Sequence, residues 1–183
     1  MRLFIAINFS GAFKAKITAL QAELRQLPVA VKWVESENIH LTLKFLGEVK
    51  PERLATISEA LKDACRGIGP LDVEAKGTGV FPNWRSPRVV WIGVSAGTPL
   101  LELQQRITVA FADLGFPADA FKPHITLGRL RPGVAAGPLQ DKLQKLADMS
   151  WGREKVRAIN LMESHLSHRG ARYSPVTTVY LSG

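Results

Sequence analysis

The sequence predicts an α+β fold in which two copies of one plan form antiparallel sheets around a central cleft. The first observation is the order of the elements, which reads β-α-β-β-α-β in the first half and starts again near Val89. The second is the spacing, since 37 residues separate Leu3 from His40 and 35 separate Val89 from His124. We therefore predict one domain over residues 1–183, made of two pseudo-symmetric lobes.

The first half of the chain supplies the first copy. Continuous or alternating apolar residues predict strands, and apolar residues at helical spacing predict helices. The predicted elements are a strand over 3–9, a helix over about 11–26, an extended VKWV segment, a strand over 39–46, a helix over about 51–66 and a strand over 71–75. This is the order of a split βαβ unit, which places its helices on one face of the sheet.

The second half starts the same plan again and then extends it. The predicted elements are a strand over 89–94, a helix over about 99–114, a strand containing PHITLGRL, a helix over about 138–149, a strand near 154–163 and a last strand, SPVTTVYL. Two stretches rich in Pro and Gly, 77–87 and 131–138, predict loops. We expect the first of these loops to cross between the lobes.

The composition favours a folded domain with an acidic ligand. Of the 183 residues, 46% are hydrophobic, which is enough for a sizeable core. Lys and Arg total 24 against 16 Asp and Glu, so the net charge is +8. Nucleic acid, a nucleotide and an anionic membrane surface all fit this balance. Because the charges are scattered, a basic cleft fits better than a basic tail.

The cysteine count and the N-terminus bear on the compartment. Cys65 is the only cysteine, so an intrachain disulfide and a cysteine-based zinc site are both excluded. The apolar run at the N-terminus is too short for a membrane-spanning helix and lacks a signal-peptide cleavage pattern. We therefore predict a cytoplasmic protein with no membrane association.

Two strands carry the same polar pattern, His-x-Thr. Side chains alternate across a strand, so His40, Thr42 and Lys44 fall on one face. Phe45 falls on the opposite, apolar face, where it is expected in the core rather than as a platform for a base. Lys44 on the histidine face is either part of a site or an ordinary solvated lysine.

The second strand repeats the pattern with His124 and Thr126. Alternation places Arg129 on the opposite face from these two residues. Arg129 reaches the histidine face only if the strand ends or bulges near Gly128, and otherwise it serves the fold. Each pattern alone is typical of a polar strand face, whereas two in matched positions favour one joint site.

Two imidazoles that face one phosphodiester can act as an acid–base pair. An unperturbed histidine pKa near 6.5 lets one ring accept a proton while the other donates one near neutral pH. Threonine hydroxyls and a nearby cation can stabilise the charge that develops on the phosphate oxygens. The pattern therefore favours in-line displacement at phosphorus, which this pair can perform without a metal.

The motifs resemble a known superfamily. The tetrads HLTL at 40–43 and HITL at 124–127 resemble the HxTx signature of the 2H phosphoesterases. RLFIAI, ENIHLTLKFLGEV, KPHITLGRLR and SHRGARYSPVTTVYL extend the resemblance over nearly the whole chain, to the 2'-5' RNA ligase-type RNA 2',3'-cyclic phosphodiesterases.

The resemblance implies a bilobal α+β hydrolase with one tetrad on each side of a basic cleft. It implies that RNA 2',3'-cyclic phosphate ends are hydrolysed to 2'-phosphates, with His40 as proton donor and His124 as proton acceptor. Thr42 and Thr126 would hold the phosphate, and Arg129 belongs to the second motif. No cofactor and no metal are implied. The partners would be RNA with cyclic phosphate ends or cyclic nucleotides, bound by a monomer, with reversible 2'-5' RNA ligation as a second reaction.

Three alternatives stay open at this point. A noncatalytic RNA- or nucleotide-binding module would keep the fold and bind without turnover. A related enzyme could act on a different small cyclic phosphate. His165 and His168 have the spacing of a metal pair, but no third ligand accompanies them, so we expect them at the entrance for substrate rather than around a metal.

Overall fold

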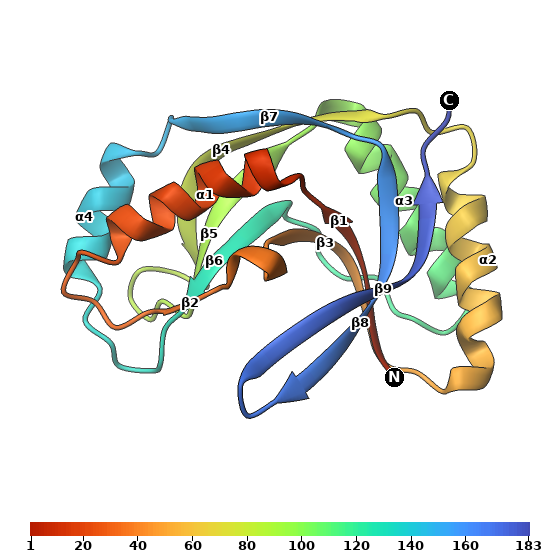
Figure 1. The fold of residues 1–183 in the computed structure, drawn as a ribbon, viewed down its shortest axis with the longest axis horizontal. Coiled ribbons are helices and arrows are strands. Elements are labelled where there is room, and N and C mark those ends of the chain that lie inside the picture. Colours follow the sequence, from red (N-terminus) through yellow and green to blue (C-terminus); the bar gives the residue numbers. More distant parts are fainter.

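The computed structural model describes residues 1–183 as nine strands and four α-helices (Figure 1). The strands are β1 Arg2–Asn8, β2 Lys32–Trp33, β3 His40–Glu48, β4 Leu71–Phe81, β5 Val89–Ser95, β6 His124–Arg129, β7 Ser150–Val156, β8 Ala158–Ser167 and β9 Gly170–Tyr180. The helices are α1 Gly11–Leu24, α2 Leu54–Cys65, α3 Gly97–Ala112 and α4 Gly137–Lys145. The predicted mixed fold with antiparallel strands is confirmed.

All nine strands belong to one antiparallel sheet. Its order is β7-β4-β5-β6-β3-β1-β8-β9, and β2 pairs with β6. The sheet is narrowest in the middle, where β3 and β6 share only the pair Leu41 and Ile125. Here we call β2, β4, β5, β6 and β7 the β6 side of the sheet, and β1, β3, β8 and β9 the β3 side.

The two halves of the chain exchange strands across this junction. β2 and β4 come from the first half, yet both pair on the β6 side. β8 and β9 come from the second half but extend the β3 side. The predicted lobe crossing at 77–87 is therefore wrong, because β4 continues to Phe81 and a hairpin loop returns the chain to β5 beside it.

Each side of the sheet has its own pair of helices (Figure 1). α1 and α4 lie on the β6 side, and α2 and α3 lie on the β3 side. The helix predicted over about 11–26 is confirmed as α1, whose apolar residues at helical spacing, Phe13, Ile17, Leu20 and Leu24, are all buried. Gln21 on the same helix is also buried, and its amide donates to the Leu127 carbonyl of β6 at 2.9 Å. This bond anchors α1 beside the strand that carries His124.

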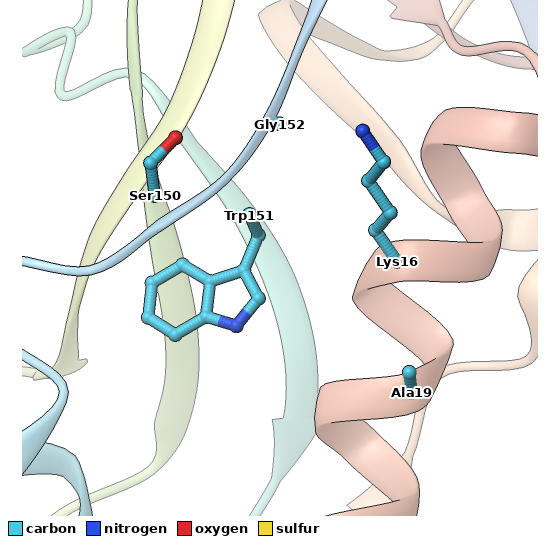
Figure 2. Close-up of a pocket in the computed structure, with 5 residues that line it drawn as sticks. All are labelled: Lys16, Ala19, Ser150, Trp151 and Gly152. Atoms are coloured by element: carbon cyan, nitrogen blue, oxygen red, sulfur yellow. The ribbon is translucent and has the colours of Figure 1, made fainter.

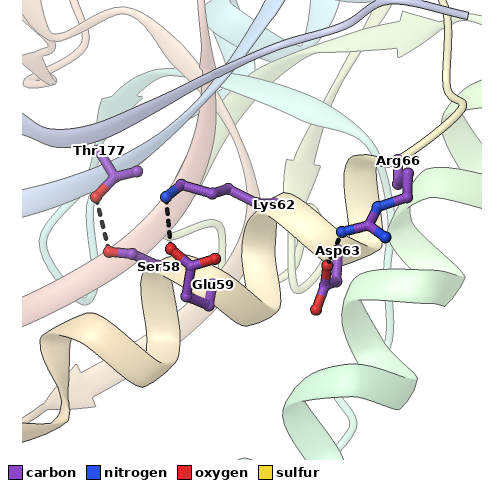
Figure 3. A network of polar contacts seen from close by, with 6 residues as sticks. All are labelled: Ser58, Glu59, Lys62, Asp63, Arg66 and Thr177. Carbon is purple, nitrogen blue, oxygen red and sulfur yellow. Dashed lines mark hydrogen bonds and ion pairs between the residues drawn. The ribbon is translucent and has the colours of Figure 1, made fainter.

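α2 is fixed to the β3 side by packing and by one polar contact. Ile57 and Leu61 are fully buried, while Ser58 and Thr177 of β9 are joined by a hydrogen bond of 2.8 Å (Figure 3). On the exposed face, Lys62 and Arg66 pair with Glu59 and Asp63 at 2.6 Å. Exposed pairs at this spacing contribute only about 0.3–0.5 kcal/mol each, so the buried face dominates.

The sheet has one face covered by helices and one open face. The large core of 40 buried residues lies on the covered face and includes Ile5, Leu41 and Ile125. A separate small cluster of Phe4, Ala6 and Met162 belongs to the other face. Two clusters on alternate residues of β1 are what the two-residue period of a strand requires.

Most predicted elements are present, with shifted ends. The strand predicted near 154–163 is instead two strands, β7 and β8, which lie in different parts of the sheet. The helix predicted from Pro51 begins as a 3₁₀ turn over Pro51–Arg53, and α2 follows at Leu54. The predicted last strand is confirmed as β9, which is longer and begins at Gly170.

Candidate active site

The two His-x-Thr motifs lie side by side at the narrow centre of the sheet. β3 and β6 are antiparallel neighbours and pair through Leu41 and Ile125. Counting outward from this pair places His40 across from Thr126, and Thr42 across from His124. The four side chains predicted from the sequence therefore surround the Leu41–Ile125 pair and are related by a local twofold axis.

Both motif strands contain a β-bulge at the fourth residue of the tetrad. Against β1, the register of β3 passes from Thr42 to Lys44 and leaves Leu43 without a partner. Against β5, the register of β6 passes from Thr126 to Gly128 and leaves Leu127 without a partner. An extra residue reverses the alternation beyond it, so each strand presents a different set of side chains from that point on.

On β6 the bulge brings Arg129 to the histidine face. Arg129 pairs with Val89 of β5, two residues from Trp91, which pairs with Thr126. The guanidinium is exposed, and its positive charge lowers the pKa of both His40 and His124. The sequence left two positions open for Arg129, and the structure has the one produced by a bulge, at Leu127 rather than at Gly128.

On β3 the same bulge overturns two predictions. Lys44 pairs with Ile5 on the covered face and is only 4% exposed, so it is neither on the histidine face nor solvated. Its ammonium donates to the Pro117 carbonyl at 2.6 Å and lies 3.8 Å from the Asp119 carboxylate. Phe45 pairs with Phe4 on the open face and is 66% exposed, so it is not in the core.

His40 is held by contacts on both ring nitrogens. Nδ1 lies 2.7 Å from the Asn38 carbonyl, which can only accept, so Nδ1 carries a proton. Nε2 faces Thr42, with Oγ1 at 3.0 Å. The ring is enclosed by Phe4 at 5.1 Å between centroids and by the edge of Tyr173 at 5.3 Å. These contacts fix the ring, with Nδ1 bonded to the backbone and Nε2 turned toward Thr42.

His124 is held in a closely similar way. Its Nδ1 lies 2.5 Å from the Lys122 carbonyl, again two residues earlier in the chain, which leaves Nε2 free to react. Phe81 meets the ring edge-on at 4.9 Å, and the indole of Trp91 lies at 6.4 Å. The two rings are thus oriented by the same hydrogen bond from Nδ1 to a backbone carbonyl, but they have different aromatic neighbours.

Sequence reasoning missed most of these aromatic neighbours. One available signal was Gly79, which lies within a strand and is followed by a partner strand with a Trp. A Cβ at Gly79 would lie 2.3 Å from the Trp91 ring, so only glycine lets the indole lie flat there. Nothing in the sequence pattern indicates that Phe4 and Tyr173, from opposite ends of the chain, meet at His40.

Both histidines favour the neutral form. Burial is the largest cause and lowers the pKa of His40 and of His124 below the ordinary 6.5. The bond from each Nδ1 to a backbone carbonyl opposes this, and the charge of Arg129 adds to the lowering. Lys14 lowers the pKa of His40 further. In the free protein both Nε2 atoms are therefore available as proton acceptors to lower pH than usual.

The other two histidines lie on the β8–β9 hairpin, which projects beyond the rest of the sheet (Figure 1). His165 is exposed and lies 3.4 Å from the Glu163 carboxylate and 3.3 Å from Ser174.

No group of three His, Cys, Asp or Glu side chains is arranged to hold a metal ion. None of the helices is both long and apolar enough to cross a membrane.

Comparisons with known proteins agree with this arrangement. The LigT like Phosphoesterase family model matches residues 7–91 and again 92–173, one unit for each histidine motif. An RNA 2',3'-cyclic phosphodiesterase of Archaeoglobus fulgidus is 39% identical over 177 residues, with 94% of this chain and 96% of the relative covered. One of Methanothermobacter thermautotrophicus is 33% identical over 175 residues and covers 95% of each chain.

Solved structures have the same fold. The crystal structure of E. coli LigT complexed with 3'-AMP has a TM-score of 0.79 and 26% identity, covering 100% of this chain and 98% of LigT. A Thermus thermophilus protein has a TM-score of 0.80 and 28% identity, covering 99% of this chain and 98% of its own. With two family units, relatives matched along nearly their whole length and a paired His-x-Thr centre, the chain belongs to the LigT-like phosphoesterase family, within the 2H phosphoesterases.

Proposed function

We propose that this protein hydrolyses RNA 2',3'-cyclic phosphate ends to 2'-phosphate ends by paired-histidine acid–base catalysis without a metal. The observation that carries the proposal is the pairing of two Nε2 atoms, one on each side of the Leu41–Ile125 junction, on one open face beside Arg129. The names of relatives that are 30–39% identical support the same substrate. The chain acts as one domain whose two pseudo-symmetric lobes each supply a tetrad.

In the proposed reaction His124 Nε2 takes a proton from water as the water oxygen bonds to phosphorus. The bond between phosphorus and O3' breaks, and His40 Nε2 gives its proton to O3'. The products are a 2'-phosphate and a 3'-hydroxyl, and exchange with solvent restores both rings. The order of roles follows the family pattern, because the two histidines are held so similarly that their local geometry does not distinguish them.

The remaining side chains of the centre stabilise the phosphate. Thr42 and Thr126 donate hydrogen bonds to nonbridging oxygens from opposite strands. Thr42 Oγ1 is bonded to His40 Nε2 in the free protein, so it turns to the phosphate when substrate binds. Arg129 presents a planar fork that matches two phosphate oxygens, and its charge offsets the negative charge that develops in the transition state.

Phe45 offers a surface for the terminal base. Its ring is 66% exposed on the open face, and its centroid lies 6.2 Å from that of Phe4, which contacts His40. Stacking on an exposed aromatic ring accepts any base, because every base has a π face. We therefore propose that Phe45 binds the nucleoside with little base preference.

The test is turnover of a nucleoside 2',3'-cyclic phosphate in the presence of EDTA, followed by phosphorus NMR. We expect a single 2'-phosphate product. A 3'-phosphate would reverse the assignment of the leaving group. Binding that weakens with salt, but with no turnover, would instead identify a noncatalytic RNA-binding module.

The same centre can join RNA ends when a 5'-hydroxyl takes the place of water. His124 Nε2 then takes the proton of the 5'-hydroxyl as its oxygen bonds to phosphorus, the bond between phosphorus and O3' breaks as His40 Nε2 gives a proton to O3', and the product is a 2'-5' linkage. The test is to mix RNA fragments with cyclic phosphate and 5'-hydroxyl ends and to look for a joined product. A monomer suffices for either reaction, since both tetrads come from one chain.

A further inference from the structure

A pocket of about 460 Å³ lies directly beyond Arg129. Its polar lining is Lys32, Arg129 and Arg131, and its apolar lining is Ala30, Val31, Leu130 and Val134. Three cations in one pocket, with no carboxylate in the lining, make a site suited to an anion. Arg129 lines this pocket, and its charge also lowers the pKa of both histidines, so Arg129 is the residue that the pocket shares with the proposed active site.

The three cations of the pocket have no acidic partner. None of them lies within ion-pair distance of a carboxylate. By contrast, Arg66, Arg106, Lys142 and Lys155 each have an acidic partner within 2.9 Å. No ion pair therefore neutralises the positive charge that the three side chains bring together in this pocket.

The fold brings these cations together through a close strand contact. β2 pairs with β6 so that Lys32 is opposite Arg129, and paired residues point to the same face. A Cβ on Gly128 would lie 2.5 Å from a Val31 methyl, so only glycine allows β2 to approach this closely. Lys32 is therefore placed on the histidine face by a glycine in the second motif.

A second hollow of the same volume gives a useful contrast. It lies between α1 and β7 and is lined by Lys16, Ala19, Ser150, Trp151 and Gly152 (Figure 2). This hollow has one cation, contains neither histidine nor Arg129, and is more open to solvent. Of these two pockets, the one beyond Arg129 has the higher concentration of positive charge and shares a residue with the proposed reaction centre.

We propose that the pocket lined by Lys32, Arg129 and Arg131 binds a backbone phosphate of the RNA strand, 5' to the nucleotide in the active site. This inference rests on the proposed function and specifies its substrate as an oligonucleotide end rather than a free cyclic nucleotide. Phe45 and this pocket lie on opposite sides of the sheet junction, so the terminal base and the upstream backbone are held apart. Arg129 joins the two phosphate sites.

The experiment compares kcat/KM for a nucleoside 2',3'-cyclic phosphate with that for tetranucleotides ending in a 2',3'-cyclic phosphate. We expect the tetranucleotide to exceed the mononucleotide by about tenfold, the effect of one hydrogen-bonded charge contact. In the double variant Lys32→Ala/Arg131→Ala this ratio falls toward one. The slope of log(kcat/KM) against log salt for the tetranucleotide becomes shallower by about 0.7 for each phosphate that the variant no longer neutralises.

The matched control is Lys50→Ala, which removes an exposed lysine beyond the opposite end of β3 from His40. This variant should keep the tetranucleotide-to-mononucleotide ratio and the salt slope. An unchanged ratio in the double variant, or a wild-type ratio of one, would overturn the subsite and leave the proposed function standing. Failure of the wild-type protein to turn over either substrate would instead overturn the proposed function.

As a second readout, fluorescence anisotropy measures the binding of a labelled tetranucleotide that ends in a 2'-phosphate. This measurement needs no turnover, so it tests the pocket even where catalysis is slow. We expect binding by the double variant to be about tenfold weaker than by the wild-type chain and Lys50→Ala. Equal affinity in all three proteins would contradict the subsite.

Discussion

The strands β3 and β6 begin alike and end differently. Both carry His-x-Thr, both fix the histidine Nδ1 on the carbonyl two residues earlier, and both bulge at the fourth residue. Five residues after its histidine, β3 presents Phe45 and β6 presents Arg129. The residues just before Phe45 and Arg129 also differ. Lys44 of β3 is buried and bonded to Pro117, whereas Gly128 of β6 has no side chain and lets β2 pack closely. Under the proposed function, the duplicated half of each strand supplies a shared reaction centre, and the diverged half separates base recognition from phosphate recognition.

The largest effect is expected where the strands are most alike. His40→Ala and His124→Ala should each lower kcat by about 10²–10⁴-fold, the usual contribution of a general acid or base. An aryl phosphodiester that releases nitrophenolate distinguishes them, because this leaving group needs no proton. His40→Ala should regain much of its rate with that substrate, and His124→Ala should not. The reverse pattern would exchange the two roles, and full activity in either variant would contradict the mechanism.

The next effect concerns the position where the strands differ. Arg129→Ala should lower kcat by about 10²-fold, in the range found for the loss of one transition-state donor. Arg129→Lys should recover only part of this, because lysine keeps the charge but lacks the planar fork. Steady-state kinetics on a nucleoside 2',3'-cyclic phosphate measures both. Equal rates for Arg129→Lys and the wild-type protein would mean that charge alone is required.

The sequence predicted the shared half of the two strands well. Alternation placed His40 and Thr42 opposite the apolar residues, and the matched spacing indicated that His124 has the same place in a second unit. Both inferences need only local periodicity and chain length, which sequence records directly. The family units at 7–91 and 92–173 agree with that duplication.

The diverged half could not be predicted, because it depends on a bulge and on distant pairing. Leu43 has no glycine beside it to mark the bulge, so alternation put Lys44 and Phe45 on the wrong faces. For Arg129, the neighbouring Gly128 did mark a close approach, but not that β2 was the approaching strand. The pairing of β2 with β6 joins segments far apart in the sequence, so the local periodicity of either segment cannot predict it.

A third prediction tests whether the bulge at Leu43 places Lys44 on the covered face and Phe45 on the open face. Phe45→Ala should raise KM for the cyclic nucleotide about tenfold, the worth of one stacked base, with little change in thermal stability. Lys44→Met should instead lower the thermal stability and leave KM unchanged, because it removes the hydrogen bond from the buried Lys44 ammonium to the Pro117 carbonyl, a charged bond worth about 1.5–3 kcal/mol. Paired kinetics and thermal unfolding separate the two. A raised KM in Lys44→Met without lost stability would mean that Lys44 lies on the histidine face, as strict alternation along β3 predicts, and not in the core.

The smallest effect is the pH dependence. The value of kcat/KM should rise with pH as His124 becomes neutral and able to accept a proton, and fall as His40 loses the proton that it donates. Because burial lowers the pKa of both rings below 6.5, the maximum of kcat/KM should lie below pH 6.5. The bound phosphate is negative and favours the protonated rings, so the maximum of kcat should lie at higher pH.

The pH profile of kcat/KM also tests how β3 and β6 differ, because only β6 carries a charged residue, Arg129, at the fifth position after its histidine. Its charge lowers the pKa of both histidines, so Arg129→Gln should move the maximum of kcat/KM to higher pH, whereas Lys50→Ala should leave it in place. Phe45, at the matching position of β3, has no charge to act on the rings. An unmoved maximum in Arg129→Gln would mean that the guanidinium acts on the bound phosphate alone, and that the two histidines owe their neutral forms to burial.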